Sequence, residues 1–255
     1  MAGTLIIFQA LLFKINIINK IKSISISEWI GGISLGLGMV CYVFGITSTT
    51  VATFMFMYAL SPLVTAIISR VLLKEKIQLS TLLAIICAFS GCIFIITESS
   101  RVGSGIGVFF SFLSMLGFCF CTVCIRWKDA GAKAQHPIIA GYVVILLSFL
   151  LMTLSSINLF KLPNINIILS LAHGGMTGIG FLMFSIGARH FLSAELVLFA
   201  QLEVVISILL SIIPLIGINE TLSSTSLIGG MLILFAVIFR SLIALSQKNK
   251  IKVAI

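Results

Sequence analysis

Apolar segments of roughly membrane-spanning length follow one another along almost the whole chain, with only short polar connections between them. A helix needs about 20 apolar residues to cross the hydrocarbon core of a bilayer. Of the 255 residues, 60% are hydrophobic and 9% are charged, which leaves too little polar surface for a water-soluble domain. No segment alternates apolar and polar residues with a period of two, as strands of a membrane barrel do. These features predict an all-α polytopic membrane protein.

Nine apolar segments are predicted to form transmembrane helices. They are residues 1–13, 30–48, 51–69, 79–97, 104–125, 137–154, 168–188, 194–217 and 223–245. The first is short, because 13 residues extend a helix by only about 20 Å. The connections between the segments are too short to hold a soluble domain.

The basic residues are distributed unevenly between alternate connections. Fourteen of the 16 Lys and Arg residues lie in odd-numbered connections or near the C-terminus, and two lie in even-numbered connections. Under the positive-inside rule, this bias predicts a multi-pass protein of the cell inner membrane with a cytoplasmic C-terminus. Trp29 and Trp127 fall on the same face, where an indole ring sits at headgroup level. The net charge of +9 therefore reports topology, and no nucleic-acid partner is expected.

Glycines of the second predicted helix recur in the seventh, each 142 positions later. The pairs are Gly32 with Gly174, Gly36 with Gly178, Gly38 with Gly180, and Gly45 with Gly187. Corresponding helices are five crossings apart, and an odd number of crossings inverts the second copy relative to the first. Inverted repeats are typical of secondary transporters. A duplication kept only for packing stays open, because each copy contains a G-x-x-x-G pattern that permits close helix approach in any membrane bundle.

The repeat divides the chain into two copies and a tail. Residues 1–97 form the first copy with four helices, residues 104–245 form the second with five, and residues 246–255 form a basic cytoplasmic tail. At the same offset, the helix at 104–125 would need a counterpart ahead of Met1. A five-plus-five architecture therefore lacks its first helix in this sequence, and we expect a misassigned start codon or a truncated gene.

Polar residues recur at helical spacing in the third and eighth predicted helices. Thr53, Met57, Ser61, Thr65 and Ser69 correspond to Glu195, Phe199, Glu203, Ser207 and Ser211. Residues four apart share one slowly turning helix face, so the two faces are predicted to meet near the pseudo-symmetry axis. The alternative is that Ser and Thr tighten helix packing or bond to the carbonyl four residues earlier. We prefer that alternative for Ser69 and Ser211.

Glu203 is the leading candidate for a coupling or binding role. It lies about 14 Å along its predicted helix, close to the bilayer centre, where an acid is costly unless it faces water, has a partner or takes up a proton. A carboxyl group that gains and loses a proton suits proton-coupled exchange or cation binding. A structural, hydrogen-bonded acid is the alternative. Glu195, at the start of the same helix, is expected to interact with the helix dipole.

Ser61 and Pro62 occupy the positions equivalent to Glu203 and Val204. A mid-helix proline frees a backbone carbonyl group and bends the helix, so both copies depart from a plain apolar helix at the same depth. The remaining substrate-binding candidates are Thr65, Tyr58, Ser207, Gln201 and His173, and Tyr42 is considered with them. Packing roles stay open for the two tyrosines, and a structural role is preferred for His173.

Cysteines and enzyme motifs give no sign of catalysis. All six cysteines lie within apolar helices: Cys41, Cys87, Cys92, Cys119, Cys121 and Cys124. Cys119 and Cys121 point about 200° apart on a helix, so they are poorly placed to bind one metal ion. We therefore interpret the cysteines as small buried side chains. Asp129 is the single Asp, which excludes an intramembrane aspartyl pair, and no H-E-x-x-H or serine nucleophile motif is present. The sequence predicts no enzyme, no cofactor and no metal.

Two segments resemble the paired signature of the EamA branch of the drug/metabolite transporter superfamily. The first runs from Ala59-Leu60-Ser61-Pro62 to Leu72-Leu73-Lys74-Glu75 and Gly91, and the second from Leu202-Glu203-Val204-Val205 to Asn219-Glu220 and Ile228-Gly229-Gly230. The second segment has three extra residues around 213–217, including Pro214. The end of the eighth predicted helix of the chain therefore departs from the pattern. The resemblance implies ten helices in inverted repeats of five. It also implies a central cavity lined by four helices of each copy, with the last helix of each peripheral.

The sequence therefore predicts a secondary transporter of a small polar organic metabolite, such as an amino acid or an S-adenosylmethionine-like compound. Transport would proceed by alternating access. The expected partners are the small-molecule substrate, the lipid bilayer and a proton as coupling ion, and a homodimer is left open. The alternatives are an inactive truncated remnant of such a transporter and a membrane scaffold or assembly protein.

Overall fold

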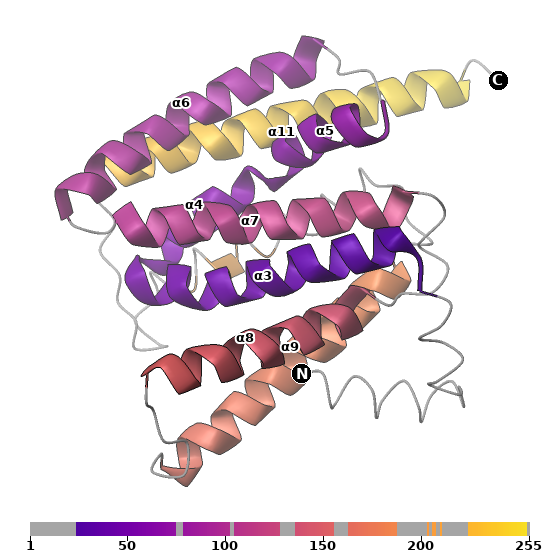
Figure 1. Cartoon of the computed structure of the whole chain (residues 1–255). Coiled ribbons are helices and arrows are strands. Elements are labelled where there is room, and N and C mark those ends of the chain that lie inside the picture. The colour runs from indigo at the N-terminus through magenta and orange to yellow at the C-terminus, as the bar shows by residue number, and fades with distance from the viewer. Residues whose placement is uncertain are drawn as a thin grey trace. The chain divides into compact units, whose positions relative to one another are not determined.

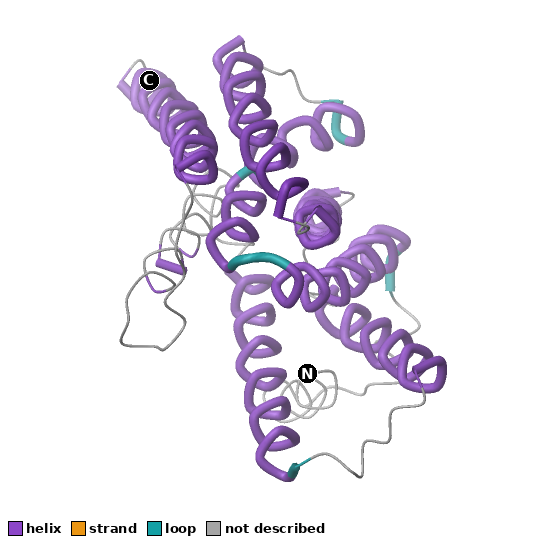
Figure 2. The backbone as a smooth tube through the Cα atoms, turned by 90° about the vertical axis from the view of Figure 1, so that its left-hand side faces the viewer, coloured by secondary structure: helices purple, strands orange, loops and turns teal. Residues whose placement is uncertain are grey.

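A computed structural model describes most of the chain between residues 24 and 253. The described residues are 24–74, 79–102, 105–127, 136–155, 163–187 and 224–253, with positions 203, 206, 207 and 210. Over these ranges the regular structure is entirely helical (Figure 1). The helices are α3 (Ile26–Ser48), α4 (Val51–Ala59), α5 (Ser61–Leu72), α6 (Leu79–Val102), α7 (Gly105–Arg126), α8 (His136–Ser155), α9 (Asn164–Gly187) and α11 (Ser224–Val253). Figure 2 shows only short loops between them in the described parts.

Four helical segments are long and apolar enough to cross a membrane. They are Ile26–Ser48, Val51–Leu72, Gly105–Ile125 and His136–Leu154. Large apolar side chains on α8 point away from the protein, with Leu146 70% and Phe149 62% exposed, as expected of a surface that faces lipid. The predicted multi-pass membrane protein is therefore confirmed. The predicted helix at 1–13 lies outside the described residues, and only four positions of the predicted helix at 194–217 are described. The count of nine helices and the inverted repeat therefore stay predictions.

The start of α3 lies four residues ahead of the predicted one. The Ser25 hydroxyl accepts the backbone N–H of Glu28 at 3.3 Å, and the Glu28 carboxylate accepts the backbone N–H of Ser25 at 2.9 Å. This reciprocal arrangement is a capping box, which satisfies two of the N–H groups that a helix start leaves free. The polar residues ahead of the apolar segment thus belong to the helix as its N-terminal cap.

The chain forms two compact units, each made of two stretches of sequence. One unit contains residues 1–40 and 120–190, and the other contains residues 41–119 and 191–255. The helices α3 and α7 each run from one unit into the other. We refer to these as unit 1 and unit 2.

In unit 1, α3 packs closely against α8 through its glycines. A Cβ atom added at Gly32 would lie 2.5 Å from the Cβ of Ile139, and one at Gly36 would lie 2.7 Å from the Cβ of Val143. Real Cβ atoms do not approach so closely, so these two positions require glycine for the contact to form. The predicted G-x-x-x-G packing is present in the first copy. In the second copy, a Cβ atom at Gly180 would meet nothing within 4 Å.

In unit 2, the core is built from large apolar side chains of α4, α5, α7 and α11. Phe54, Met57, Leu60, Leu63, Met115 and Ile233 are almost completely buried. The helix α11 packs along α6 and also contacts α4. At the first of these contacts, a Cβ atom on Gly91 would lie 2.5 Å from the carbonyl oxygen of Gly229. The absence of side chains therefore lets the two backbones meet.

Candidate functional site

The predicted helix at 51–69 is broken in its middle. Its two parts are α4, which ends at Ala59, and α5, which begins at Ser61, with Leu60 forming a turn between them. Pro62 lies in the first turn of α5, where the N–H group that proline lacks would have no partner within α5. The N–H groups of Leu63 and Val64 both bond to the Leu60 carbonyl at 3.0 Å and start α5 afresh. The bend predicted from Pro62 is thus present as a break.

Next to the break, α4 is tied to α7 by a pair of hydroxyl groups. The phenolic oxygen of Tyr58, one turn before Pro62, lies 2.8 Å from the hydroxyl oxygen of Ser114. Ser114 is buried, and Tyr58 is half-buried. Because either oxygen can act as donor, the pair can reverse its polarity when a third polar group arrives.

Aromatic rings pack around the ring of Tyr58. The rings of Phe54 and Tyr58 are stacked with centroids 5.1 Å apart, and Tyr42 from α3 meets Phe54 edge-on at 4.8 Å. Tyr42 also lies edge-on to Tyr58 at 6.5 Å, and Phe118 of α7 lies 6.3 Å from Tyr58. These arrangements are the ones that the charge distribution of aromatic rings favours. We call the four residues the aromatic cluster.

On the other side of the break, α5 contacts α7 through a cysteine. The Cys119 thiol lies 3.4 Å from the carbonyl oxygen of Ser61 and is also a hydrogen-bond partner of Thr65. Cys119 is completely buried, as are Cys121 and Cys124 to within 4%. The buried, small-residue interpretation of these cysteines therefore agrees with the structure. Cys119 also contacts two polar residues of α5, Ser61 and Thr65.

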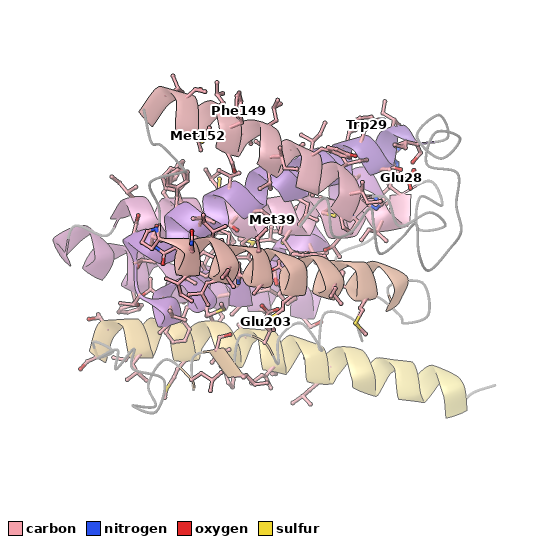
Figure 3. The ribbon with its side chains drawn as sticks, turned by 90° about the horizontal axis from the view of Figure 1, so that it is seen from below. Glu28, Trp29, Met39, Phe149, Met152 and Glu203 are labelled. Atoms are coloured by element: carbon pink, nitrogen blue, oxygen red, sulfur yellow. The ribbon has the colours of Figure 1, made fainter. Side chains whose placement is uncertain are left out.

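Glu203 belongs to unit 2 and has an exposed side chain (Figure 3). Its carboxyl group lies close enough to Tyr42 and to Tyr58 to act electrostatically on both phenols. An acid of the second predicted copy is therefore within electrostatic range of the aromatic cluster. The residues of the cluster itself come from α3, α4 and α7.

Not every predicted site residue joins this group. Unit 2 contains Ser61, Pro62, Thr65, Tyr58 and Glu203 around the break. Ser207 is also in unit 2 and is half-buried, while Gln201 lies outside the described residues. His173 lies in unit 1 on α9, where its side chain is exposed and its carbonyl accepts the Thr177 hydroxyl at 2.8 Å. That bond uses the backbone carbonyl of His173 and does not involve its imidazole.

Three residues of the group were not anticipated from the sequence: Phe54, Ser114 and Phe118. Ser114 and Phe118 are four residues apart on α7, so they share a helix face. A serine beside an aromatic residue at this spacing, in an otherwise apolar helix, is a weak signal that could have pointed to them. Which helix this face meets depends on tertiary packing, which the sequence pattern alone does not specify.

Comparison with known proteins bears on the first part of the chain. Residues 1–97 match the EamA-like transporter family. No curated protein and no solved structure matches the chain. The matched segment contains the helix break with Tyr58, Ser61 and Pro62. Residues 1–97 are thus similar to the EamA-like family of membrane transporters, which confirms the resemblance to the drug/metabolite type for this part of the chain.

Proposed function

We propose that this protein is a secondary transporter of a small polar organic metabolite that carries a cationic group, such as an amino acid or an S-adenosylmethionine-like compound. The family match supports the membrane-transporter part of the proposal. The substrate class rests on the chemistry around the helix break. We propose the cell inner membrane as its location, with the C-terminus in the cytoplasm.

The observation that carries the substrate class is that Glu203 belongs to the same unit as Tyr42 and Tyr58 and lies within electrostatic range of both phenols. A carboxylate attracts a cation directly, and the face of an aromatic ring attracts it through the negative charge at its centre. The hydroxyl pair of Tyr58 and Ser114 adds groups that can donate to, or accept from, a carboxylate or hydroxyl on the substrate. The group as a whole therefore favours a zwitterion or an organic cation over an anion.

The break between α4 and α5 supports a role in binding. Transporters commonly place their substrate where a transmembrane helix is interrupted, because the interruption exposes backbone groups at membrane depth. The segment Val51–Leu72 is a single apolar span in length and composition, and its interruption at Leu60 lies near its middle. Tyr58, Ser61 and Thr65 thus lie within about one turn of this interruption.

Alternating access is the mechanism we propose, with the two predicted copies as the moving parts. The family match covers residues 1–97, which is also the extent of the predicted first copy. The last helices of the two predicted copies, α6 and α11, pack against each other at Gly91 and Gly229. A contact between the last helices of the two copies is compatible with a two-fold axis between the copies.

Counterflow into proteoliposomes tests the proposal. The full chain would be loaded with unlabelled compound, and uptake of labelled lysine, S-adenosylmethionine, leucine and glutamate would be compared with empty liposomes. We expect exchange of at least one of the cationic compounds and none of glutamate. Exchange of glutamate alone would contradict the cationic substrate class, and the absence of exchange for every compound would contradict this substrate range.

The role of Glu203 is tested in the same assay. We expect Glu203→Gln to abolish exchange or to uncouple it from protons, because the amide keeps the shape of the side chain but loses the charge. Glu195→Gln is the matched control, since the sequence puts Glu195 at the start of the same predicted helix, away from its middle. Wild-type flux in Glu203→Gln would remove Glu203 from the site. If neither protein exchanges any compound, a scaffold would be favoured instead.

A further inference from the structure

Two titratable side chains of unit 1, Glu28 and His136, are fully buried. Each has 0% of its surface exposed. Within the described part of the chain, Oε1 of Glu28 and both ring nitrogens of His136 are buried without a hydrogen-bond partner. Buried polar groups are nearly always paired, because an unpaired one costs about 1–3 kcal/mol. Two such groups in one small unit therefore call for a common explanation.

The Glu28 carboxylate has one oxygen in use and one to spare. Oε2 accepts the Ser25 backbone N–H at 2.9 Å and the Ser25 hydroxyl at 3.2 Å, which completes the cap of α3. Oε1 takes no part in the cap. The capping role thus explains the position of Glu28 in the first turn, and it leaves the second oxygen available for another group.

The imidazole of His136 lies against the next turn of the same helix. A Cβ atom added at Gly31 would be 2.5 Å from Cδ2 and 3.1 Å from Nε2 of His136. Glu28 and Gly31 are three residues apart, so they share a helix face with Cβ positions about 5–6 Å apart. A glutamate side chain spans that distance. The imidazole therefore lies near the Glu28 side chain, and because the two groups share no direct hydrogen bond, one water molecule would bridge them.

We propose that Glu28 and His136 together bind one proton, which His136 carries as imidazolium and the Glu28 carboxylate stabilises. The proton comes from the aqueous phase at the ends of α3 and α8 that are predicted to be cytoplasmic. It adds to the free ring nitrogen of His136, and no other bond forms or breaks. Binding converts a neutral ring beside a carboxylate into a charge-assisted pair.

The titratable groups on the three elements at this position are few. Among the described side chains, α3 contributes Glu28, Cys41 and Tyr42, α7 contributes Cys119, Cys121 and Cys124, and α8 contributes His136 and the exposed Tyr142. Of the cysteines, Cys124 packs against the same turn of α3, with its Cβ 2.8 Å from the Cβ position of Gly31. A neutral thiol does not compensate an imidazolium, so Glu28 is the group that can hold the proton on His136.

The pair would link proton uptake to the contact between α3 and α8. Gly31 and Gly32 bring the two helices together at the same level, so an added attraction between Glu28 and His136 strengthens that contact. Glu28 and Trp29 lie at one end of α3 (Figure 3). The pair shares no residue with the aromatic cluster of unit 2 and is a second site, separate from the proposed substrate site.

Titration of His136 by NMR in the full chain tests the proposal. The protein would be held in lipid nanodiscs, and the His136 imidazole signal would be identified as the one lost in His136→Gln. We expect this signal to titrate, with a midpoint that falls by about 1 pH unit in Glu28→Gln. The Ser27→Ala variant, at a buried neighbour of Glu28, should keep the wild-type midpoint. An unchanged midpoint in Glu28→Gln, or no titration in the wild type, would overturn the proposal.

A second variant covers the case in which Glu28→Gln does not fold. Glu28→Asp keeps the negative charge at the start of α3 but shortens the side chain by one methylene group, so the carboxylate reaches less far toward His136. We expect the midpoint of the His136 signal in this variant to lie below that of the wild type. An unchanged midpoint in Glu28→Asp as well would mean that the carboxylate does not act on His136, and the pair would be rejected.

Discussion

The phenolic oxygen of Tyr58 on α4 lies 2.8 Å from the hydroxyl oxygen of Ser114 on α7. Tyr58 belongs to the part of the chain that matches the transporter family, and Ser114 lies beyond it. The bond therefore joins the family segment to the rest of the chain beside the helix break. It is a specific link whose strength can be measured.

We expect Tyr58→Phe and Ser114→Ala each to destabilise the protein by about 1 kcal/mol, because each leaves one buried hydroxyl group unpaired or removes it. The double variant should cost less than the two single variants added together. Equilibrium unfolding in mixed micelles of the four proteins gives the coupling energy, for which we expect roughly 0.5–1.5 kcal/mol. Strict additivity would show that the two hydroxyl groups do not interact.

Gly36→Ala should destabilise the protein by about 1–3 kcal/mol, because the new Cβ would lie 2.7 Å from the Cβ of Val143 and 2.9 Å from the Ala140 carbonyl oxygen. The matched control is Gly180→Ala on α9, where a Cβ meets nothing within 4 Å. There the substitution should be neutral or stabilise by up to about 1 kcal/mol through helix propensity. Thermal unfolding of both variants measures the difference, and equal changes would contradict the α3–α8 packing.

Pro62→Ala should restore an N–H group at the break and let α4 and α5 approach one continuous helix. We expect stronger protection of the amides of Leu60 and Ser61 in hydrogen exchange, together with slower transport. Pro163→Ala, at an exposed position just before α9, is the control for replacing a proline at a helix start. Unchanged protection at Leu60 would mean that packing around Tyr58 and Ser114, and not the proline, maintains the break.

Reporter fusions test the orientation predicted from the charge bias. Green fluorescent protein fused after Ile255 should fluoresce, and alkaline phosphatase fused at the same place should be inactive, because the basic tail is expected in the cytoplasm. A phosphatase fusion after Gly103, in an even-numbered connection, should be active. The opposite pattern at both positions would reverse the predicted topology.

Hydropathy predicted the apolar cores of the helices well and their ends less well. The predicted start at Ile30 missed Ser25 and Glu28, whose capping box starts α3 among polar residues that a hydropathy pattern leaves out. The S-x-x-E spacing was the signal that could have corrected it. Pro62 correctly indicated the irregular point of the third predicted helix, because the chemistry of proline acts locally.

The partners of each helix face could not be predicted in the same way. Tyr58 was a candidate from its place near Pro62, but Ser114 became its partner only through the packing of α7 against α4. The glycines of α3 indicated a close helix approach without identifying α8 as the helix approached. Such pairings depend on contacts between residues far apart in sequence, on which local patterns carry no information.

The contact of Gly32 and Gly36 with Ile139 and Val143 also limits how this protein can change in evolution. Each glycine lies against a branched side chain whose volume fills the space that a substituent would need. A larger residue at position 36 becomes acceptable only after position 143 has become smaller, so the order of the two mutations matters. Positions 32 with 139 and 36 with 143 are therefore expected to covary among relatives, with the sum of their side-chain volumes nearly constant.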